Sequence, residues 1–149
     1  MTMTAPGYQI RPASLIDADQ VAGLAGELAQ SFPFDRAAFD RSYPALLADD
    51  RACLLVAAGM DGCLGYVLGF AHLTFYANGP VAWVEEILVR PEHRRRRVGE
   101  ALMAAFGEWA TGHDCALVAL ATRRAAPFYL ALGYEESAVY LRRVLRDGS

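Results

Sequence analysis

The sequence predicts a single α/β domain in which helices flank a mostly antiparallel sheet with one parallel pair of strands near its centre. Two observations carry this prediction. Apolar-patterned segments follow one another in the order strand, two helices, three strands, helix, strand, helix, strand, without a repeat or a linker. The three consecutive strands are joined by short turns, as in antiparallel hairpins, and the later strand–helix–strand unit favours parallel pairing. With 149 residues, 54% of them hydrophobic, the chain is long enough to bury one core.

The first half of the domain is predicted to begin with a strand and two helices. The strand Tyr8–Arg11 alternates in polarity, and an amphipathic helix follows it. Its first turn contains Asp17 and Asp19. Its apolar side consists of Val21, Leu24, Ala25 and Leu28. The segment Ser31–Phe34 ends this helix. A second helix is predicted over Asp35–Leu47, interrupted near Pro44 because proline lacks the N–H that a helix interior needs.

The second half is predicted to contain a hairpin, a third strand and two strand–helix pairs. Turns are expected at Met60–Gly62 and Asn78–Pro80, and Gly112 and Gly133 are expected to end helices. In chain order the predicted elements are the strands Ala52–Ala58, Cys63–Tyr76 and Val81–Val89, the helix Arg97–Thr111, the buried strand Ala116–Ala121, the helix Ala125–Leu132 and the strand Ala138–Leu145.

Composition narrows the class of protein. Residues 1–7 are expected to form a flexible tail and residues 8–146 one folded domain. The net charge of −3 gives no general reason to expect nucleic-acid or membrane binding. The cysteines, three in number, have no metal-ligand spacing, and no apolar run reaches the roughly 20 residues that span a bilayer. We therefore expect a cytoplasmic protein with structural thiols and no metal.

A cluster of arginines lies where a strand passes into a helix. The segment is Val89-Arg90-Pro91-Glu92-His93-Arg94-Arg95-Arg96-Arg97-Val98-Gly99, and we call residues 90–97 the basic turn. A helix start presents unpaired N–H groups and a partial positive charge, so it attracts phosphate. The pattern predicts a binding site for a diphosphate. A solvated basic helix start and an arginine patch for nucleic acid are the alternatives, but four adjacent arginines in an acidic protein make a narrow patch for nucleic acid.

Arg94–Gly99 resembles the Gln/Arg-x-x-Gly-x-Gly/Ala motif of the GCN5-related N-acetyltransferase (GNAT) superfamily. Two further segments resemble that superfamily at the family's spacing: Val84–Pro91 upstream and Ala126–Tyr134 downstream. The element order fits as well, so the resemblance covers nearly the whole chain. It implies the GNAT fold, with a splayed parallel pair in the sheet, and acetyl-CoA as acyl donor. Arg97 stands where the family more often has glycine, which the motif tolerates if that position does not require positive φ.

The resemblance also implies which residues bind the cofactor. Backbone groups of the strand before the basic turn would hold the pantetheine arm, and the motif's amides would hold the pyrophosphate. The full set is Ile87, Leu88, Val89, Arg94, Arg95, Arg96, Arg97, Val98, Gly99, Glu100, Thr122, Arg123 and Tyr129. Thr122 and Arg123 depart from an asparagine common in relatives. Arg123 and Arg124 either meet the phosphates of the nucleotide or end the strand in solvent, and both readings stay open.

Three residues are candidates for catalysis. An amine with a pKa near about 10 must lose a proton before attack, so a carboxylate is needed. Glu85 and Glu86 both qualify, and strand alternation would let only one face the substrate; Glu85 matches an acidic position of relatives that acetylate polyamines and aminoglycosides. The N–H of Leu88 is expected to stabilise the oxyanion and Tyr129 to protonate the departing thiolate. The alternatives are surface carboxylates, a tyrosine that only packs its ring, and His72, which is more often a core histidine than a base.

Together these features predict an N-acetyltransferase that moves acetyl from acetyl-CoA to a primary amine by direct attack in a ternary complex. The aromatic residues of the segment 30–50 favour a small-molecule acceptor. A protein N-terminus or lysine is the alternative acceptor, and a CoA-binding module without turnover is the alternative class. A homodimer is expected from family habit, with no nucleic-acid or membrane partner.

Overall fold

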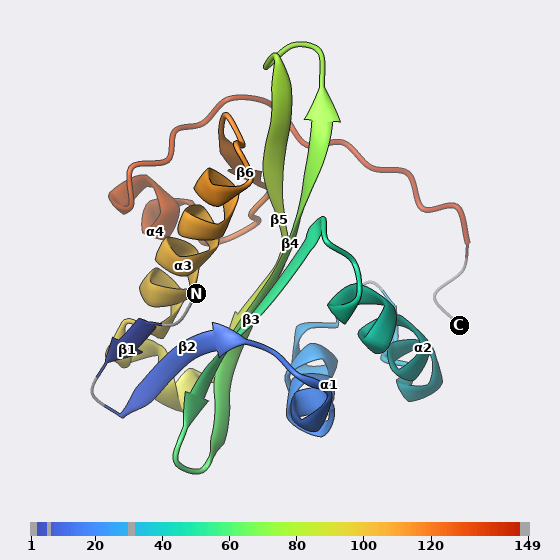
Figure 1. Cartoon of the computed structure of the whole chain (residues 1–149), viewed down its shortest axis with the longest axis vertical. Helices are drawn as coiled ribbons and strands as arrows, with labels where there is room; N and C mark the ends of the chain where they lie inside the picture. The colour runs from blue at the N-terminus through green and yellow to red at the C-terminus, as the bar shows by residue number, and fades with distance from the viewer. Residues whose placement is uncertain (1–2, 6, 30–31, 147–149) are drawn as a thin grey trace.

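One six-stranded sheet runs through the domain in the computed structural model, which describes residues 3–5, 7–29 and 32–146 (Figure 1). Its strands lie in chain order: β1 Met3–Ala5, β2 Tyr8–Pro12, β3 Ala52–Gly59, β4 Gly62–Thr74, β5 Gly79–Val89 and β6 Val118–Leu120. The helices are α1 Ala18–Leu28, α2 Arg36–Leu47, α3 Val98–Gly112 and α4 Ala126–Ala131, with 3-10 turns at Leu15–Asp17 and Pro91–Arg96. All strand pairs are antiparallel except β5–β6, so the predicted fold class is confirmed.

The sheet separates two layers of helices. Helices α1 and α2 cover one face and helices α3 and α4 the other (Figure 1). Side chains of β3 and β4 alternate between the two cores: Tyr66 packs with α1 and α2, whereas Val67 packs with α3. Strands covered on both faces need apolar side chains at every position, which explains the continuous apolar runs in the sequence. We call the side of α1 and α2 the α1/α2 face.

The first half of the chain differs from expectation in two places. Residues 3–5 are not a tail, because β1 pairs with β2 and Gly7, at φ 84°, makes the tight turn between them. Residues 1, 2 and 6 lie outside the described residues, as do Gln30 and Ser31, the second of which is the first residue of the predicted helix break. Helix α2 runs through Pro44 without interruption. Because proline has no N–H, one carbonyl in the preceding turn of the helix lacks its hydrogen bond. Pro44 is exposed, so water can bond to that carbonyl instead.

The C-terminal part of the chain differs more. Strand β6 is shorter than predicted, and its side chains are half-buried rather than buried. Residues 138–145, predicted as the last strand, pair with no strand among the described residues. The parallel pair β5–β6 therefore lies at one edge of the sheet and not near its centre.

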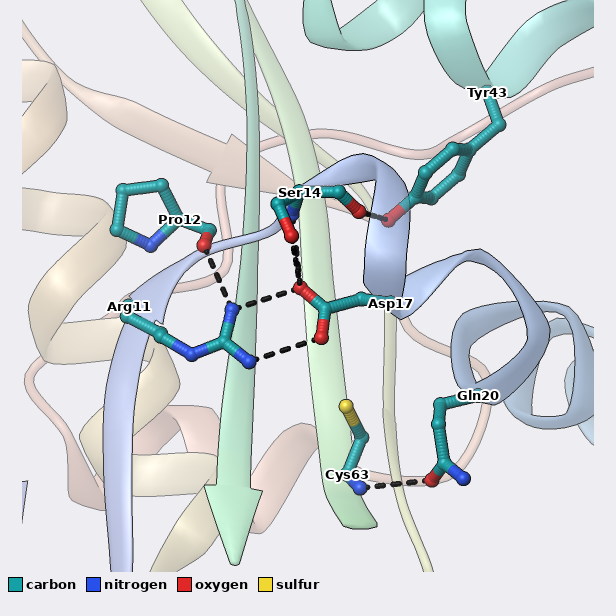
Figure 2. A network of polar contacts seen from close by, with 7 residues as sticks. All are labelled: Arg11, Pro12, Ser14, Asp17, Gln20, Tyr43 and Cys63. Carbon is teal, nitrogen blue, oxygen red and sulfur yellow. Dashed lines mark hydrogen bonds and ion pairs between the residues drawn. The ribbon is translucent and has the colours of Figure 1, made fainter.

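A polar network fastens the α1/α2 layer to the sheet (Figure 2). Arg11 donates two hydrogen bonds to the carboxylate of Asp17, of 2.7 and 2.9 Å, and the N–H of Ser14 donates a third, of 2.8 Å. Tyr43 of α2 donates to the carbonyl of Ser14 at 2.7 Å. The N–H of Cys63 donates to the side chain of Gln20 at 2.9 Å. The hydrogen bonds from Arg11 hold the pKa of Asp17 below its usual range, although burial opposes them.

We expect Asp17→Asn to lower the free energy of unfolding at pH 7 by about 2 kcal/mol, because it removes hydrogen bonds to a charged, buried carboxylate. A lowered folded-state pKa contributes stability above the unfolded value of about 3.9, and this contribution is lost as the pH falls through the folded value. The difference in the free energy of unfolding between the wild type and Asp17→Asn, measured by urea unfolding, should therefore shrink below about pH 4. Asp19→Asn, at an exposed surface pair, is the control and should change little.

Candidate active site

A gap opens where β5 and β6 part. Their parallel pairing covers three residue pairs and ends at Val84 and Leu120. Strand β5 continues to Val89, so the edge of Glu85–Val89 that would face β6 has no strand partner in the described part of the chain. This is the splayed parallel pair that the sequence predicts.

A β-bulge decides which backbone groups face this gap. Pairing with β4 passes from Leu68↔Glu86 to Gly69↔Val84, so Glu85 is an extra residue in β5. Beyond the bulge, Arg90 donates its N–H to the carbonyl of Leu64 at 2.8 Å. Because hydrogen-bonded and non-bonded pairs alternate in an antiparallel ladder, the residues two and four positions before Arg90 also bond to β4.

The same alternation turns the backbone N–H groups of Ile87 and Val89 away from β4 and toward the gap. Leu88 pairs with Tyr66, and its N–H is used in the ladder. The prediction that the N–H of Leu88 stabilises the oxyanion is therefore corrected: the N–H groups of Ile87 and Val89 are the ones that a ligand between β5 and β6 can reach. The carbonyl of Val89 accepts a hydrogen bond from Arg94 at 3.3 Å.

The two neighbouring glutamates have different surroundings. Glu86 accepts a hydrogen bond of 2.7 Å from the hydroxyl of Tyr66, which is buried on the α1/α2 face. Burial, with the nearby carboxylate, raises the pKa of Tyr66 above its ordinary value, so it remains a donor. Glu85 is exposed, and its carboxylate makes no hydrogen bond or ion pair to the residues that the structure describes. The bulge interrupts the alternation that would otherwise place the two side chains on opposite faces.

The basic turn has the shape of an anion site. It forms a 3-10 turn that ends at Arg97, whose backbone is left-handed at φ 59° and ψ 27°, and α3 begins at Val98. A right-handed turn followed by a left-handed residue aims successive N–H groups into one concavity. The first backbone hydrogen bond of α3 runs from the N–H of Ala101 to the carbonyl of Arg97. The N–H groups of Val98, Gly99 and Glu100 therefore have no partner within the helix and lie at its positive end.

The arginine side chains of the turn spread in different directions. Arg94 bonds to Val89, and Arg96 lies 5.7 Å from the ring centre of Tyr8. Arg97 is 84% exposed, with its Nε 3.9 Å from Glu100. The side chain of Arg95 lies outside the described part of the structure. A hollow of about 500 Å³ borders the turn at Arg90 and Arg96 but includes neither Ile87 nor Tyr129. The backbone of the gap and the helix start, and not this hollow, defines the candidate site.

The left-handed backbone at Arg97 makes a prediction about stability. The position requires positive φ, so the condition under which the motif tolerates arginine is not met, and the residue is strained. We expect Arg97→Gly to raise the free energy of unfolding by about 0.5 to 1 kcal/mol. Asn78→Gly, at the same φ, is the control and should gain less, because asparagine tolerates this conformation. Urea unfolding measures both; a loss of stability in Arg97→Gly would contradict the account.

Helix α4 places Tyr129 beside the helix start. A Cβ atom on Gly99 would lie 3.3 Å from the ring of Phe128, so α3 and α4 touch at this point. Tyr129 packs in the α3-side core, edge-on to Phe128 at 4.9 Å and to Tyr134 at 5.9 Å between ring centres. Its hydroxyl makes no hydrogen bond to the described residues, and burial raises its pKa. The phenol is therefore protonated at neutral pH and available to a ligand.

The remaining candidates are placed as follows. Thr122 accepts a hydrogen bond from the N–H of Ala125, the residue before α4, at 3.0 Å, and Arg123 is exposed beside it. His72 is exposed, which corrects its reading as a core histidine. All three cysteines are free thiols, and burial raises the pKa of Cys53 to about 12. Within the described residues, no group of three or more metal-ligating side chains comes together.

Comparison with known proteins identifies the family. Residues 21–134 match the family described as "Acetyltransferase (GNAT) family". The chain is 31% identical over 139 residues to the aminoglycoside N(6')-acetyltransferase type 1 of Salmonella typhimurium, a match that covers 86% of this chain and 92% of that protein. The chain belongs to the GNAT family. A relative of the same name from Klebsiella aerogenes is 37% identical over 97 residues, which span 58% of this chain and 62% of that protein.

Solved structures of GNAT enzymes have the same fold as this chain. An aminoglycoside N-acetyltransferase, AAC(6')-Iy, in complex with CoA is 25% identical, with a TM-score of 0.80 over 96% of this chain and 100% of that chain. Glucosamine-6-phosphate N-acetyltransferase from Arabidopsis thaliana has a TM-score of 0.83 at 16% identity, over 93% of this chain and 99% of that one, which shows the shared fold. The predicted family and fold are confirmed. Among the described helices, none is long and apolar enough to cross a membrane.

Proposed function

We propose that this protein is an acetyl-CoA-dependent N-acetyltransferase whose acceptor is a small, polycationic amine of the aminoglycoside type. The observation that carries the proposal is the gap between β5 and β6, which the N–H groups of Ile87 and Val89 face and which leads to the start of α3, where the turn has the shape of an anion site. Family membership supports the donor, and the relatives named aminoglycoside N(6')-acetyltransferase support the acceptor.

The donor would lie along the gap. Its pyrophosphate would accept hydrogen bonds from the N–H groups of Val98, Gly99 and Glu100, and the exposed side chain of Arg97 would add a contact. Its pantetheine arm would pair with the backbone of Ile87 and Val89, as a short strand does. Opposite them, Thr122 and Arg123 follow the end of β6, and the exposed Arg123 would meet a phosphate.

The reaction would be a direct attack in a ternary complex. Glu85, acting through water, takes a proton from the ammonium group, and the amine nitrogen forms a bond to the thioester carbon. The N–H groups of Ile87 and Val89 donate to the carbonyl oxygen as negative charge develops on it. The carbon–sulfur bond then breaks, and Tyr129 gives its proton to the sulfur of CoA. The second proton that the nitrogen loses passes through water to Tyr129 and restores its phenol. The products are the acetylated amine and free CoA, with no acyl-enzyme.

Charge along the chain favours a cationic acceptor. Residues 17–50, which form the α1/α2 layer, hold seven carboxylates and two arginines, whereas the basic turn holds five arginines and one glutamate. An acidic surface attracts a polycation and a basic one attracts a diphosphate, so the two substrates are drawn to different sides. The exposed rings of Phe32 and Phe34 supply an apolar wall on the acidic side. The proposed assembly is a cytoplasmic homodimer without nucleic-acid or membrane partners.

Two aminoglycosides that differ only at the 6′ carbon, one with an amine and one with a hydroxyl, test the proposal. With acetyl-CoA, the amine compound should release free CoA thiol and gain the mass of one acetyl group, and the hydroxyl compound should do neither. A peptide with a free N-terminus and a lysine is the comparison substrate. Faster acetylation of the peptide would support the protein-acceptor alternative. Tight binding of acetyl-CoA without turnover of any amine would indicate a CoA-binding module.

A further inference from the structure

The basic turn is fastened to other parts of the protein near both of its ends. At its first residue, Arg90 donates its Nε–H to the carbonyl of Cys63 at 3.1 Å and pairs with Glu27 of α1 at 3.0 Å. Near its last residue, the hydroxyl of Tyr8 donates a hydrogen bond of 3.1 Å to the carbonyl of Arg96. Tyr8 is the first residue of β2, so this bond joins two parts of the chain that lie 88 residues apart.

Between these two ends, the turn borders open space. The hollow of about 500 Å³ lies there, lined by Glu92 and His93 from the middle of the turn and by Gly7 and Met60 from two hairpin turns. Closely packed side chains would hold a backbone in place by contact alone, but an open hollow does not. The conformation of the turn therefore depends on the polar contacts at its two ends.

The hydroxyl of Tyr8 bonds to a peptide group that controls the start of α3. This peptide group joins Arg96 to Arg97 and is a rigid plane, so a contact that holds its carbonyl restricts the torsion angles on both sides. One of them is φ of Arg97, the left-handed residue that precedes α3. A strained residue keeps its conformation only where the surrounding structure enforces it. Loss of the hydrogen bond would let Arg97 relax, and the N–H groups of Val98–Glu100 would lose their common direction.

The side chain of Arg96 adds to the same contact. Its guanidinium lies over the ring of Tyr8, 5.7 Å from the ring centre, and its Nη1 is 3.2 Å from Nδ1 of His93. A cation at this distance from an aromatic face is attracted to it. The guanidinium also passes so close to Gly7 that a Cβ atom there would overlap it. Tyr8 therefore contacts Arg96 twice, through its hydroxyl and through its ring.

We propose that Tyr8 is a positioning residue for acetyl-CoA: its hydroxyl holds the peptide group between Arg96 and Arg97 in the orientation that aims the N–H groups of Val98–Glu100 at the diphosphate. The inference rests on the proposed donor site at the start of α3. The ring of Tyr8 packs in the same core as Val98, so the tyrosine joins this core to the turn. Arg96 then braces the turn from the side of β2 and is not itself a phosphate ligand.

Tyr8→Phe tests the proposal, because it keeps the ring in the α3-side core and removes only the hydroxyl. The dissociation constant of acetyl-CoA in calorimetric titration should rise about threefold to tenfold, as expected for the loss of one hydrogen bond. The kcat at saturating acetyl-CoA should stay within about twofold of the wild-type value, since the reacting groups are unchanged.

Tyr43→Phe is the matched control. It removes a bond of the same kind, from the hydroxyl of a buried tyrosine to the carbonyl of Ser14, but on the α1/α2 face. Both variants should lower the melting temperature. Only Tyr8→Phe should weaken the binding of acetyl-CoA. An unchanged dissociation constant in Tyr8→Phe, or an equal loss of affinity in Tyr43→Phe, would overturn the proposal.

Arg97→Gly separates positioning from a general loss of stability. Glycine adopts the left-handed conformation without strain, so a turn with glycine depends less on the hydrogen bond from Tyr8. The rise caused by Tyr8→Phe should therefore fall to within about twofold when it is measured in the Arg97→Gly protein. A rise of equal size in both backgrounds would show that the hydroxyl does not act through Arg97, and the positioning role would be wrong.

Arg97→Glu distinguishes a failure of this inference from a failure of the donor site. A carboxylate at the start of α3 repels a diphosphate bound there, so the dissociation constant of acetyl-CoA should rise about tenfold or more. If it rises and Tyr8→Phe has no effect, the donor site is correct and the role of Tyr8 is wrong. If Arg97→Glu binds acetyl-CoA as the wild type does, the diphosphate lies elsewhere and both proposals are overturned.

Discussion

Tyr129→Phe should lower kcat for acetyl transfer about a hundredfold and leave the dissociation constant of acetyl-CoA nearly unchanged. The phenol would act only when the carbon–sulfur bond breaks, so its loss affects the transition state and not the bound donor. The ring stays in the α3-side core, where it contacts Phe128 and Tyr134, and phenylalanine preserves this packing. Steady-state kinetics and calorimetric titration with acetyl-CoA provide the two numbers.

Tyr134→Phe is the matched control for this experiment. Tyr134 lies next to Tyr129, and burial raises its pKa in the same way, but no role in the reaction is assigned to it. We expect the kcat of Tyr134→Phe to stay within about twofold of the wild-type value, as for a substitution away from the reacting groups. Equal losses in kcat and in acetyl-CoA affinity for Tyr129→Phe would instead indicate that the tyrosine only packs.

Glu85→Gln should lower kcat/KM about a hundredfold, and the loss should be largest at neutral pH, where the amine is mostly protonated. At high pH the amine loses its proton to solvent, so the deficit should become smaller. Glu86→Gln is the control, since glutamine can still accept the hydrogen bond from Tyr66. A full-range pH profile of both variants measures the effect. A large loss in Glu86→Gln with normal activity in Glu85→Gln would move the proton acceptor to Glu86.

Most of the fold could be predicted from local patterns. The hairpins of β3, β4 and β5 follow from apolar runs between Asp-Gly and Asn-Gly turns, and α3 from its apolar face and the glycine at its end. The gap between β5 and β6, which the resemblance to the GNAT superfamily implies and no local pattern predicts, is present as well. The last strand did not, although residues 138–145 have the correct alternation. A strand needs a partner, and a sequence pattern does not say whether the partner belongs to the same chain.

The details of the site depended on features that residue patterns do not reveal. A bulge of one residue at Glu85 reverses which backbone groups face the gap, and so Ile87 and Val89 replace Leu88 as the proposed oxyanion donors. Two adjacent glutamates inside an otherwise apolar strand are the one signal that could have suggested it. Arg97 adopted a conformation that its side chain disfavours, because the turn geometry at the start of α3 outweighs the preference of one residue.

The central claim is that the junction after Val89 binds the diphosphate of acetyl-CoA with main-chain donors, and a crystal structure with acetyl-CoA tests it most directly. We predict the pyrophosphate within hydrogen-bond distance of the N–H groups of Val98–Glu100 and the pantetheine arm between β5 and β6, bonded to Ile87 and Val89. A nucleotide bound elsewhere, or an empty gap at saturating acetyl-CoA, would contradict the account.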